Sequence, residues 1–150
     1  MTRQACGVLA VVIGTATAVI AAGTDTTLRD GLYSADQAKR GKVEYTTFCG
    51  GCHLADLSGT LSGDGGAPPL RGEPFVAFIE TWNVRQLFDY IRTTMPADDP
   101  SALTNDQYLD VLAYVFQMNG YPSGPAALGL RQLQDIRMPA PGRAERGTDK

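Results

Sequence analysis

Histidine occurs only once in this chain of 150 residues, and cysteine only three times. A metal site built from several imidazoles is therefore excluded, and a Ser-His-Asp triad is limited to one position. Charged residues make up only 19% and the formal net charge is -3, which argues against nucleic acid as a partner. The length and a hydrophobic share of 43% indicate one globular domain with a tail. The sequence shows no internal repeat and no alternating strand pattern.

Residues 1–22 have the pattern of an export signal. Arg3 is the only charged residue before Asp25, and the run between them is mostly apolar or small. This pattern predicts a secretory signal peptide over 1–22, a linker over 23–31 and a periplasmic location. The alternative is an uncleaved membrane anchor, for which the run is just long enough although only mildly apolar.

Removal of the signal takes Cys6 with it and leaves two cysteines, three positions apart. They are Cys49 and Cys52, and His53 follows directly. The spacing C-x-x-C-H is the attachment signature of c-type haem. Residues i and i+3 lie on one side of a helical turn, so both thiols can add to the two vinyl groups on one edge of the porphyrin. The imidazole of the next residue can then bind the iron.

Three other interpretations of this motif are weaker. A thioredoxin-like redox pair would follow a strand, whereas a helical pattern precedes Cys49. A structural zinc site needs four ligands, and the mature chain has no further Cys or His to complete it. A disulfide between Cys49 and Cys52 would leave His53 unexplained. The sequence therefore favours one covalently attached haem c per chain.

The sixth iron ligand should be a methionine, because the only imidazole is already used. Met95 ends an amphipathic segment and is followed by Pro96, which stops a helix. Met118 lies within a helical apolar pattern and is expected in the core, while Met138 lies in a charged, Pro-rich tail. Met95 is thus the predicted ligand. The alternative is that Met95 is a loop contact and the iron is open or otherwise ligated.

Two capping boxes predict where helices begin. Ser34-Ala-Asp-Gln37 opens a helix that runs to about Cys49, and Thr104-Asn-Asp-Gln107 opens a helix over 106–119. Further helices are predicted over 83–94 and 73–80. The side chains expected to face the core are Leu87, Phe88, Ile91, Tyr108, Leu109, Val111, Leu112, Ala113, Val115 and Phe116.

The region 32–122 resembles class I cytochrome c. Gly41, Tyr45 and Cys49 reproduce the family's G-x-x-x-(aromatic)-x-x-x-C opening, which precedes the attachment motif. The resemblance implies an all-α fold whose helices pack around one covalently bound haem. It also implies that the Gly41 helix crosses the C-terminal helix, and that the iron is held by His53 and Met95.

Other segments of the chain carry the same resemblance. Pro68-Pro-Leu70-Arg-Gly is similar to the family's P-x-L-x-G segment, which implies that the Pro68 carbonyl accepts from His53 Nδ1-H and that Leu70 packs on the haem. Thr81-Trp82-Asn is similar to the segment near the propionates, which implies that Trp82 Nε1-H reaches a propionate. Tyr90 would approach the methionine side. Ordinary core packing is the alternative for Leu70, Trp82 and Tyr90.

The run from Leu87 to Pro96 is similar to bacterial cytochromes associated with quinoprotein (PQQ-type) dehydrogenases. This resemblance implies a non-enzymatic, periplasmic one-electron carrier of a respiratory chain. Its partners would be a dehydrogenase donor and a cytochrome or terminal oxidase acceptor. The alternatives are a bound subunit of a larger redox complex, and a haem peroxidase or gas sensor with a labile methionine.

The extension 123–150 lies outside the family match and is expected to be disordered from about 139. Leu130, Leu133 and Ile136 are spaced by three. They suggest either a strap that covers the core or a docking segment for a partner.

Overall fold

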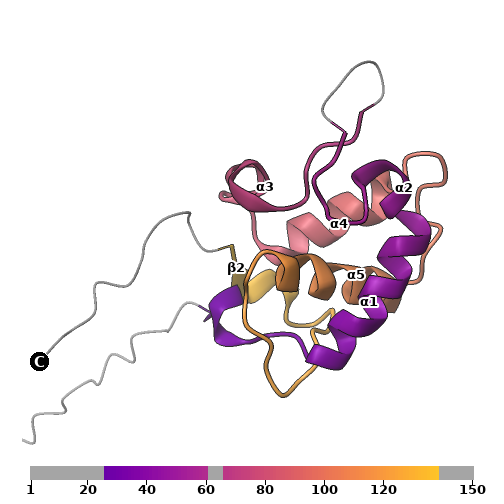
Figure 1. The fold of residues 1–150 in the computed structure, drawn as a ribbon. Coiled ribbons are helices and arrows are strands. Elements are labelled where there is room, and N and C mark those ends of the chain that lie inside the picture. Colours follow the sequence, from indigo (N-terminus) through magenta and orange to yellow (C-terminus); the bar gives the residue numbers. More distant parts are fainter. Residues whose placement is uncertain (1–25, 61–65, 139–150) are drawn as a thin grey trace, which may run out of the picture.

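The computed structural model describes residues 26–60 and 66–138. The predicted signal peptide and the stretch from 139 onward, which is expected to be disordered, lie outside the described residues. Five α-helices dominate the described part (Figure 1): α1 (Ala35–Phe48), α2 (Gly50–His53), α3 (Gly72–Ile79), α4 (Val84–Thr94) and α5 (Asn105–Met118). The predicted all-α class is confirmed. Helix α2 is a short turn that the sequence pattern had not separated from α1. None of the helices in these ranges is long and apolar enough to cross a membrane.

Two very short strands add to the predicted helices. β1 (Thr26–Thr27) and β2 (Ile136–Arg137) pair in parallel, with Thr26 opposite Ile136. Each is followed or preceded by a 3-10 turn, η1 (Leu28–Asp30) after β1 and η2 (Leu133–Asp135) before β2. Two residues are too few to show alternation, so no sequence pattern predicts them.

The helix starts depend on side-chain caps. The Thr104–Gln107 capping box forms as predicted. The Thr104 hydroxyl accepts from the Gln107 amide, and the Gln107 side chain accepts from the Thr104 amide. The Ser34 box is only half formed. The Ser34 hydroxyl accepts from the Gln37 amide at 3.1 Å, but the Gln37 side chain bonds elsewhere in the protein.

Helices α1 and α5 cross with almost no space between their backbones, at the glycine that the resemblance places there. A methyl group on Gly41 would lie 1.7 Å from the Asp110 carbonyl oxygen, so no larger residue fits. Beside the crossing, Arg40 grips the Asp110 carboxylate through Nε at 2.7 Å and a terminal nitrogen at 2.9 Å. This bidentate pair fixes how far α1 slides along α5.

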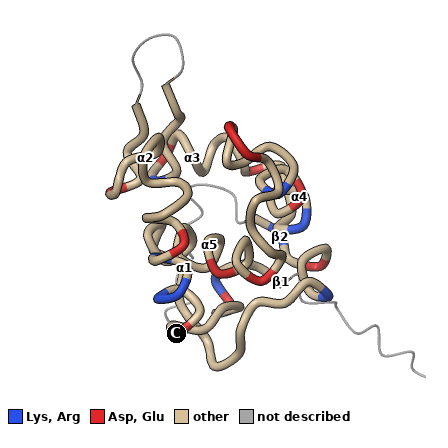
Figure 2. The backbone as a smooth tube through the Cα atoms, turned by 90° about the vertical axis from the view of Figure 1, so that its right-hand side faces the viewer, with Lys and Arg blue, Asp and Glu red and all other residues tan. Residues whose placement is uncertain are grey.

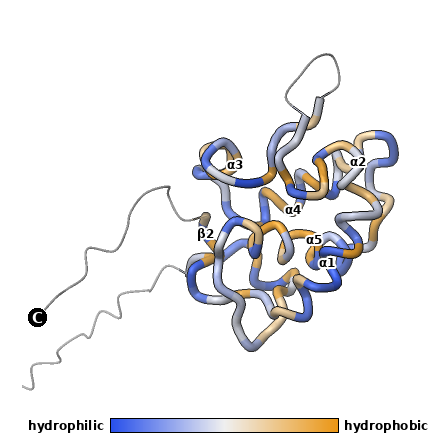
Figure 3. The backbone as a smooth tube through the Cα atoms, in the orientation of Figure 1, coloured by the Kyte–Doolittle hydropathy of each residue, from blue (hydrophilic) through white to orange (hydrophobic). Residues whose placement is uncertain are grey.

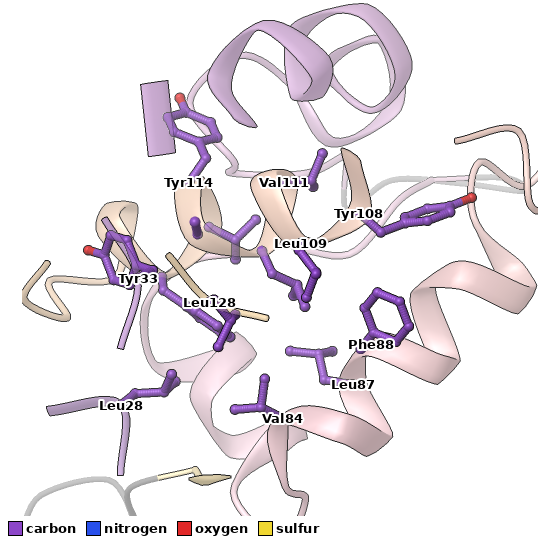
Figure 4. Close-up of a cluster of buried hydrophobic side chains, with 14 of the residues drawn as sticks. Leu28, Tyr33, Val84, Leu87, Phe88, Tyr108, Leu109, Val111, Tyr114 and Leu128 are labelled. Atoms are coloured by element: carbon purple, nitrogen blue, oxygen red, sulfur yellow. The ribbon is translucent and has the colours of Figure 1, made fainter. Parts of the chain in front are cut away.

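The core surrounds α5, whose residues 108–116 are all buried. Figure 3 shows hydrophobic residues along this helix, and the buried residues of α4 are Val84, Leu87 and Phe88. In Figure 4, Leu87 and Phe88 from α4 point toward Leu109 of α5, while Tyr33 and Leu128 close the cluster from the other side. Leu87 and Phe88 are buried as expected, whereas Ile91 is only partly buried against the core.

The segment 121–138 wraps the domain as a strap. Leu133 and Ile136 are buried, as the core-covering interpretation requires, although Leu130 is 36% exposed. Leu128 is bound at both backbone groups by one side chain: its amide donates to Gln37 Oε1 at 2.7 Å, and its carbonyl accepts from Gln37 Nε2 at 3.1 Å. Because the Gln37 side chain makes these two bonds, it does not bond back to the Ser34 amide and complete the capping box.

The packed region therefore extends beyond 32–122 at both ends. Leu28, within the segment expected to be linker, is fully buried. The strap ends beside α4, where the Met138 amide donates to the Trp82 carbonyl at 3.3 Å.

Two methionine environments differ from expectation. Met138 is buried at 6% exposure, because the strap brings it onto the core instead of leaving it in a solvated tail. Met118, expected in the core, is 38% exposed because the buried stripe of α5 stops at Phe116.

Replacement of Gln37 by alanine is expected to lower the free energy of unfolding by about 1–3 kcal/mol, because it leaves the buried amide and carbonyl of Leu128 without partners. Denaturant titration of the holoprotein measures this loss. The control is Lys39→Ala, which removes a pair with Asp36 whose side chains are 76% and 82% exposed. That change should have almost no effect. Equal losses in the two variants would contradict the role given to Gln37.

Candidate haem site

The attachment turn follows directly from the end of α1. The Cys49 amide donates to the Tyr45 carbonyl at 2.8 Å, which continues the helix into the motif. The amides of Cys52 and His53 then both donate to the Cys49 carbonyl, at 3.2 and 2.9 Å. One tight turn therefore carries both thiols and the imidazole on a backbone that α1 has already placed.

No disulfide joins the two cysteines; Cys49 is half-buried and Cys52 is exposed. Burial, and to a lesser extent the neighbouring Cys52, raises the pKa of Cys49 to about 11. A redox-active C-x-x-C pair needs a thiolate of low pKa, whereas burial shifts the pKa of the Cys49 thiol upward. Within residues 26–60 and 66–138, no cluster of three or more His, Cys, Asp and Glu side chains is placed to hold a metal ion. The thioredoxin-like and zinc interpretations thus gain no support.

His53 is buried, with 7% exposure, and its ring is held in one orientation. Nδ1 lies 2.8 Å from the Pro68 carbonyl oxygen, the contact that the resemblance implies. Because a carbonyl only accepts, Nδ1 must carry the proton, and Nε2 keeps its lone pair for a metal. Such a bond also raises the basicity of the ligating nitrogen.

The segment that carries Pro68 is itself tied down. The Leu70 amide donates to the Leu57 carbonyl at 2.9 Å, and Leu70 packs partly buried against the core. Asn119, at the end of α5, donates to the Leu70 carbonyl and accepts from the Gly72 amide, both at 2.9 Å. Sequence reasoning missed Asn119, whose only local signal is its place before Gly120.

The backbone after His53 is strained. Leu54 has φ 63° and ψ 156°, a backbone region that residues other than glycine rarely adopt. The Tyr45 hydroxyl donates to the Leu54 carbonyl at 2.8 Å. Tyr45 is buried, and burial raises its pKa well above the usual value, so the phenol stays a donor. Tyr45 thus holds the strained exit of the attachment turn.

Met95 is the C-terminal cap of α4. Its amide donates to the Ile91 carbonyl at 2.8 Å, and the residue is half-buried. Its carbonyl accepts a bond from the Tyr108 hydroxyl. Met118 points to solvent at the end of α5, and Met138 is enclosed in the strap. Met95 as the second iron ligand stays a prediction, and the exposed Met118 and the enclosed Met138 are the other methionines of the described residues.

The rings of Trp82 and Tyr90 are in contact with each other. Their ring centroids are 5.4 Å apart in an edge-on arrangement, and Phe78 of α3 completes a triad at 5.1 Å from Trp82. Trp82 is half-buried, while Tyr90 is 40% and Phe78 53% exposed. Phe78 was not predicted as a site residue, because it lies outside the motifs.

This donor set fits haem c. Two neighbouring cysteines are not joined by a disulfide, the imidazole of His53 has Nδ1 bonded to a carbonyl, and the thioether residue Met95 ends a helix in the same domain.

A comparison with known families agrees with the geometry. A family model described as "Cytochrome C oxidase, cbb3-type, subunit III" matches residues 36–115, more than half of the chain. The chain belongs to this family of class I c-type cytochrome domains. Searches of curated proteins and of solved structures found no match. The family shows the class I cytochrome c fold, covalently bound haem c at Cys49 and Cys52, and electron transfer as the activity.

Covalent attachment is directly testable in protein isolated from its native host. After denaturation and acid-acetone extraction the colour should stay with the polypeptide, and the mass should be that of the chain plus one haem. Cys52→Ala should leave a single thioether, whereas Ser58→Ala, five residues beyond the motif, should leave attachment unchanged. Release of all colour from the unaltered protein would contradict the site.

Proposed function

We propose that this protein is an exported, periplasmic monohaem cytochrome that carries single electrons from a dehydrogenase of the quinoprotein type to a downstream cytochrome or terminal oxidase. The observation that carries the proposal is the C-x-x-C-H turn, in which the Pro68 carbonyl fixes His53 through Nδ1. Met95, at the end of α4, would be the second iron ligand. The export pattern of 1–22 and the similarity of the Leu87–Pro96 run to quinoprotein-associated cytochromes support the location and the donor.

When bound, haem supplies a one-electron couple between ferric and ferrous iron. His53 would present Nε2 in the correct tautomer, and the soft thioether of Met95 would favour the ferrous state and raise the potential. With both His53 and Met95 holding the iron, oxygen or peroxide would find no easy access to it. No residue would then act as a catalytic acid, base or nucleophile.

A second candidate is a subunit held permanently in a larger complex. The family description names an oxidase subunit, which favours an oxidase as the complex. The electron transfer would be the same, but the protein would not diffuse. Fractionation of cells of the native host without detergent distinguishes the two. A diffusing carrier should be recovered in the soluble fraction, and a subunit of a membrane complex should stay with the membranes.

Met95→Ala is expected to abolish the weak absorption band at about 695 nm that marks methionine sulfur on ferric iron. The same variant should bind carbon monoxide readily in the ferrous state, because one axial position is open. Met118→Ala, which removes an exposed methionine, should leave both properties unchanged. Rapid carbon monoxide binding by the unaltered protein would instead favour a gas sensor or peroxidase.

Docking on the donor is expected to involve the acidic pair Asp98 and Asp99, which are exposed and closely follow Met95. Figure 2 shows charges of both signs along α1 and α4, so net charge alone gives no docking face. Replacement of both aspartates by asparagine should slow reduction by the donor a few-fold at low ionic strength. Asp36→Asn with Asp135→Asn removes equal charge at other exposed positions and should have less effect. Equal rates in both double variants would contradict this docking site.

A further inference from the structure

We propose that Tyr108 is a positioning residue for the iron ligand Met95: its hydroxyl holds the main chain of Met95 and so keeps the sulfur from being displaced. The inference rests on the proposed function, in which Met95 is the axial ligand. It concerns a residue that sequence reasoning assigned only to the core.

The contact joins two separate elements of the fold. The Tyr108 hydroxyl of α5 donates to the Met95 carbonyl at 2.6 Å, across 13 positions of sequence. Tyr108 is 3% exposed, so water competes poorly for this bond.

The donor is held in place more firmly than a surface tyrosine would be. Its backbone lies in the first turn of α5, where the Tyr108 amide donates to the Thr104 carbonyl at 3.0 Å. Its ring meets Phe88 edge to face, with centroids 6.4 Å apart and planes at 87°. Figure 4 shows the two rings side by side, with the hydroxyl pointing away from Leu109 and the hydrophobic cluster. The Tyr108 ring packs in the hydrophobic core, and its hydroxyl oxygen bonds to the Met95 carbonyl.

The acceptor needs such a restraint. Met95 has extended dihedrals, φ -128° and ψ 147°, and is the point at which α4 stops. Residues 97–102, which follow Pro96, are all exposed. The Met95 amide is bound to α4 and its carbonyl to α5, so the main chain is fixed on both sides of the side chain. Loss of the carbonyl bond would leave the residue attached to α4 alone.

The consequence is a change in ligand exchange rather than in the fold. An external ligand can take the place of the sulfur only when the Met95 segment opens. Removing one hydrogen bond from the closed form should favour the open form on the order of two- to tenfold.

The experiment uses ferric holoprotein and imidazole as the external ligand, with loss of absorbance at about 695 nm as the readout. Tyr108→Phe keeps the ring and removes the hydroxyl. The matched control is Tyr33→Phe, since Tyr33 is also buried and its hydroxyl also donates to a distant backbone carbonyl, that of Tyr121 in the strap. Thermal unfolding followed by circular dichroism reports the global stability of each variant.

We expect Tyr108→Phe to bind imidazole about two- to tenfold more tightly than the unaltered protein, and Tyr33→Phe to bind it equally, even where both lose similar global stability. Unchanged affinity in Tyr108→Phe, or an equal gain in both variants, would overturn the proposal. If the unaltered protein shows no 695 nm band, the assignment of Met95 fails, which is a different result. Should Tyr108→Phe not accumulate, Phe88→Leu loosens the ring while leaving the hydroxyl, and it must also increase imidazole affinity for the proposal to stand.

Discussion

The close backbone contact between α1 and α5 at Gly41 is the constraint on which the haem site depends. Because nothing larger than a hydrogen atom fits there, α1 has one position on α5, and the end of α1 delivers Cys49. Helix α5 in turn bonds to the segments that carry both predicted ligands. Near its start Tyr108 holds the Met95 carbonyl, and at its end, about three turns later, Asn119 holds the segment that carries Pro68. One helix pair thus sets the relative places of both predicted ligands.

Local sequence patterns predicted the parts of the fold that local interactions determine. The C-x-x-C-H motif, the Thr104 capping box and the apolar stripe of α5 each act within a few residues, and each is found in the structure. The contact of His53 with Pro68 was accessible only through the family resemblance. The burial of Tyr108 follows from helical spacing, but the partner of its hydroxyl does not, because that partner lies in another element.

The remaining features depend on distant partners, and sequence patterns cannot choose among those. Gln37 has the spacing of a capping residue, yet its amide group serves Leu128, 91 positions away, where two buried backbone groups would otherwise lack partners. Two methionines also have environments opposite to those expected. The strap buries Met138, and the end of α5 leaves Met118 exposed. A pattern records which residues are apolar, but the path of the chain decides which of them are covered.

The parallel pairing of β1 with β2 brings the two ends of the described chain together. Thr26 and Ile136 lie opposite each other, and Figures 1 and 2 both place these strands on the side of the molecule away from α2. A tag or surface linker joined directly at residue 26 or residue 138 would therefore start on the side of the molecule away from the turn that carries Cys49 and Cys52.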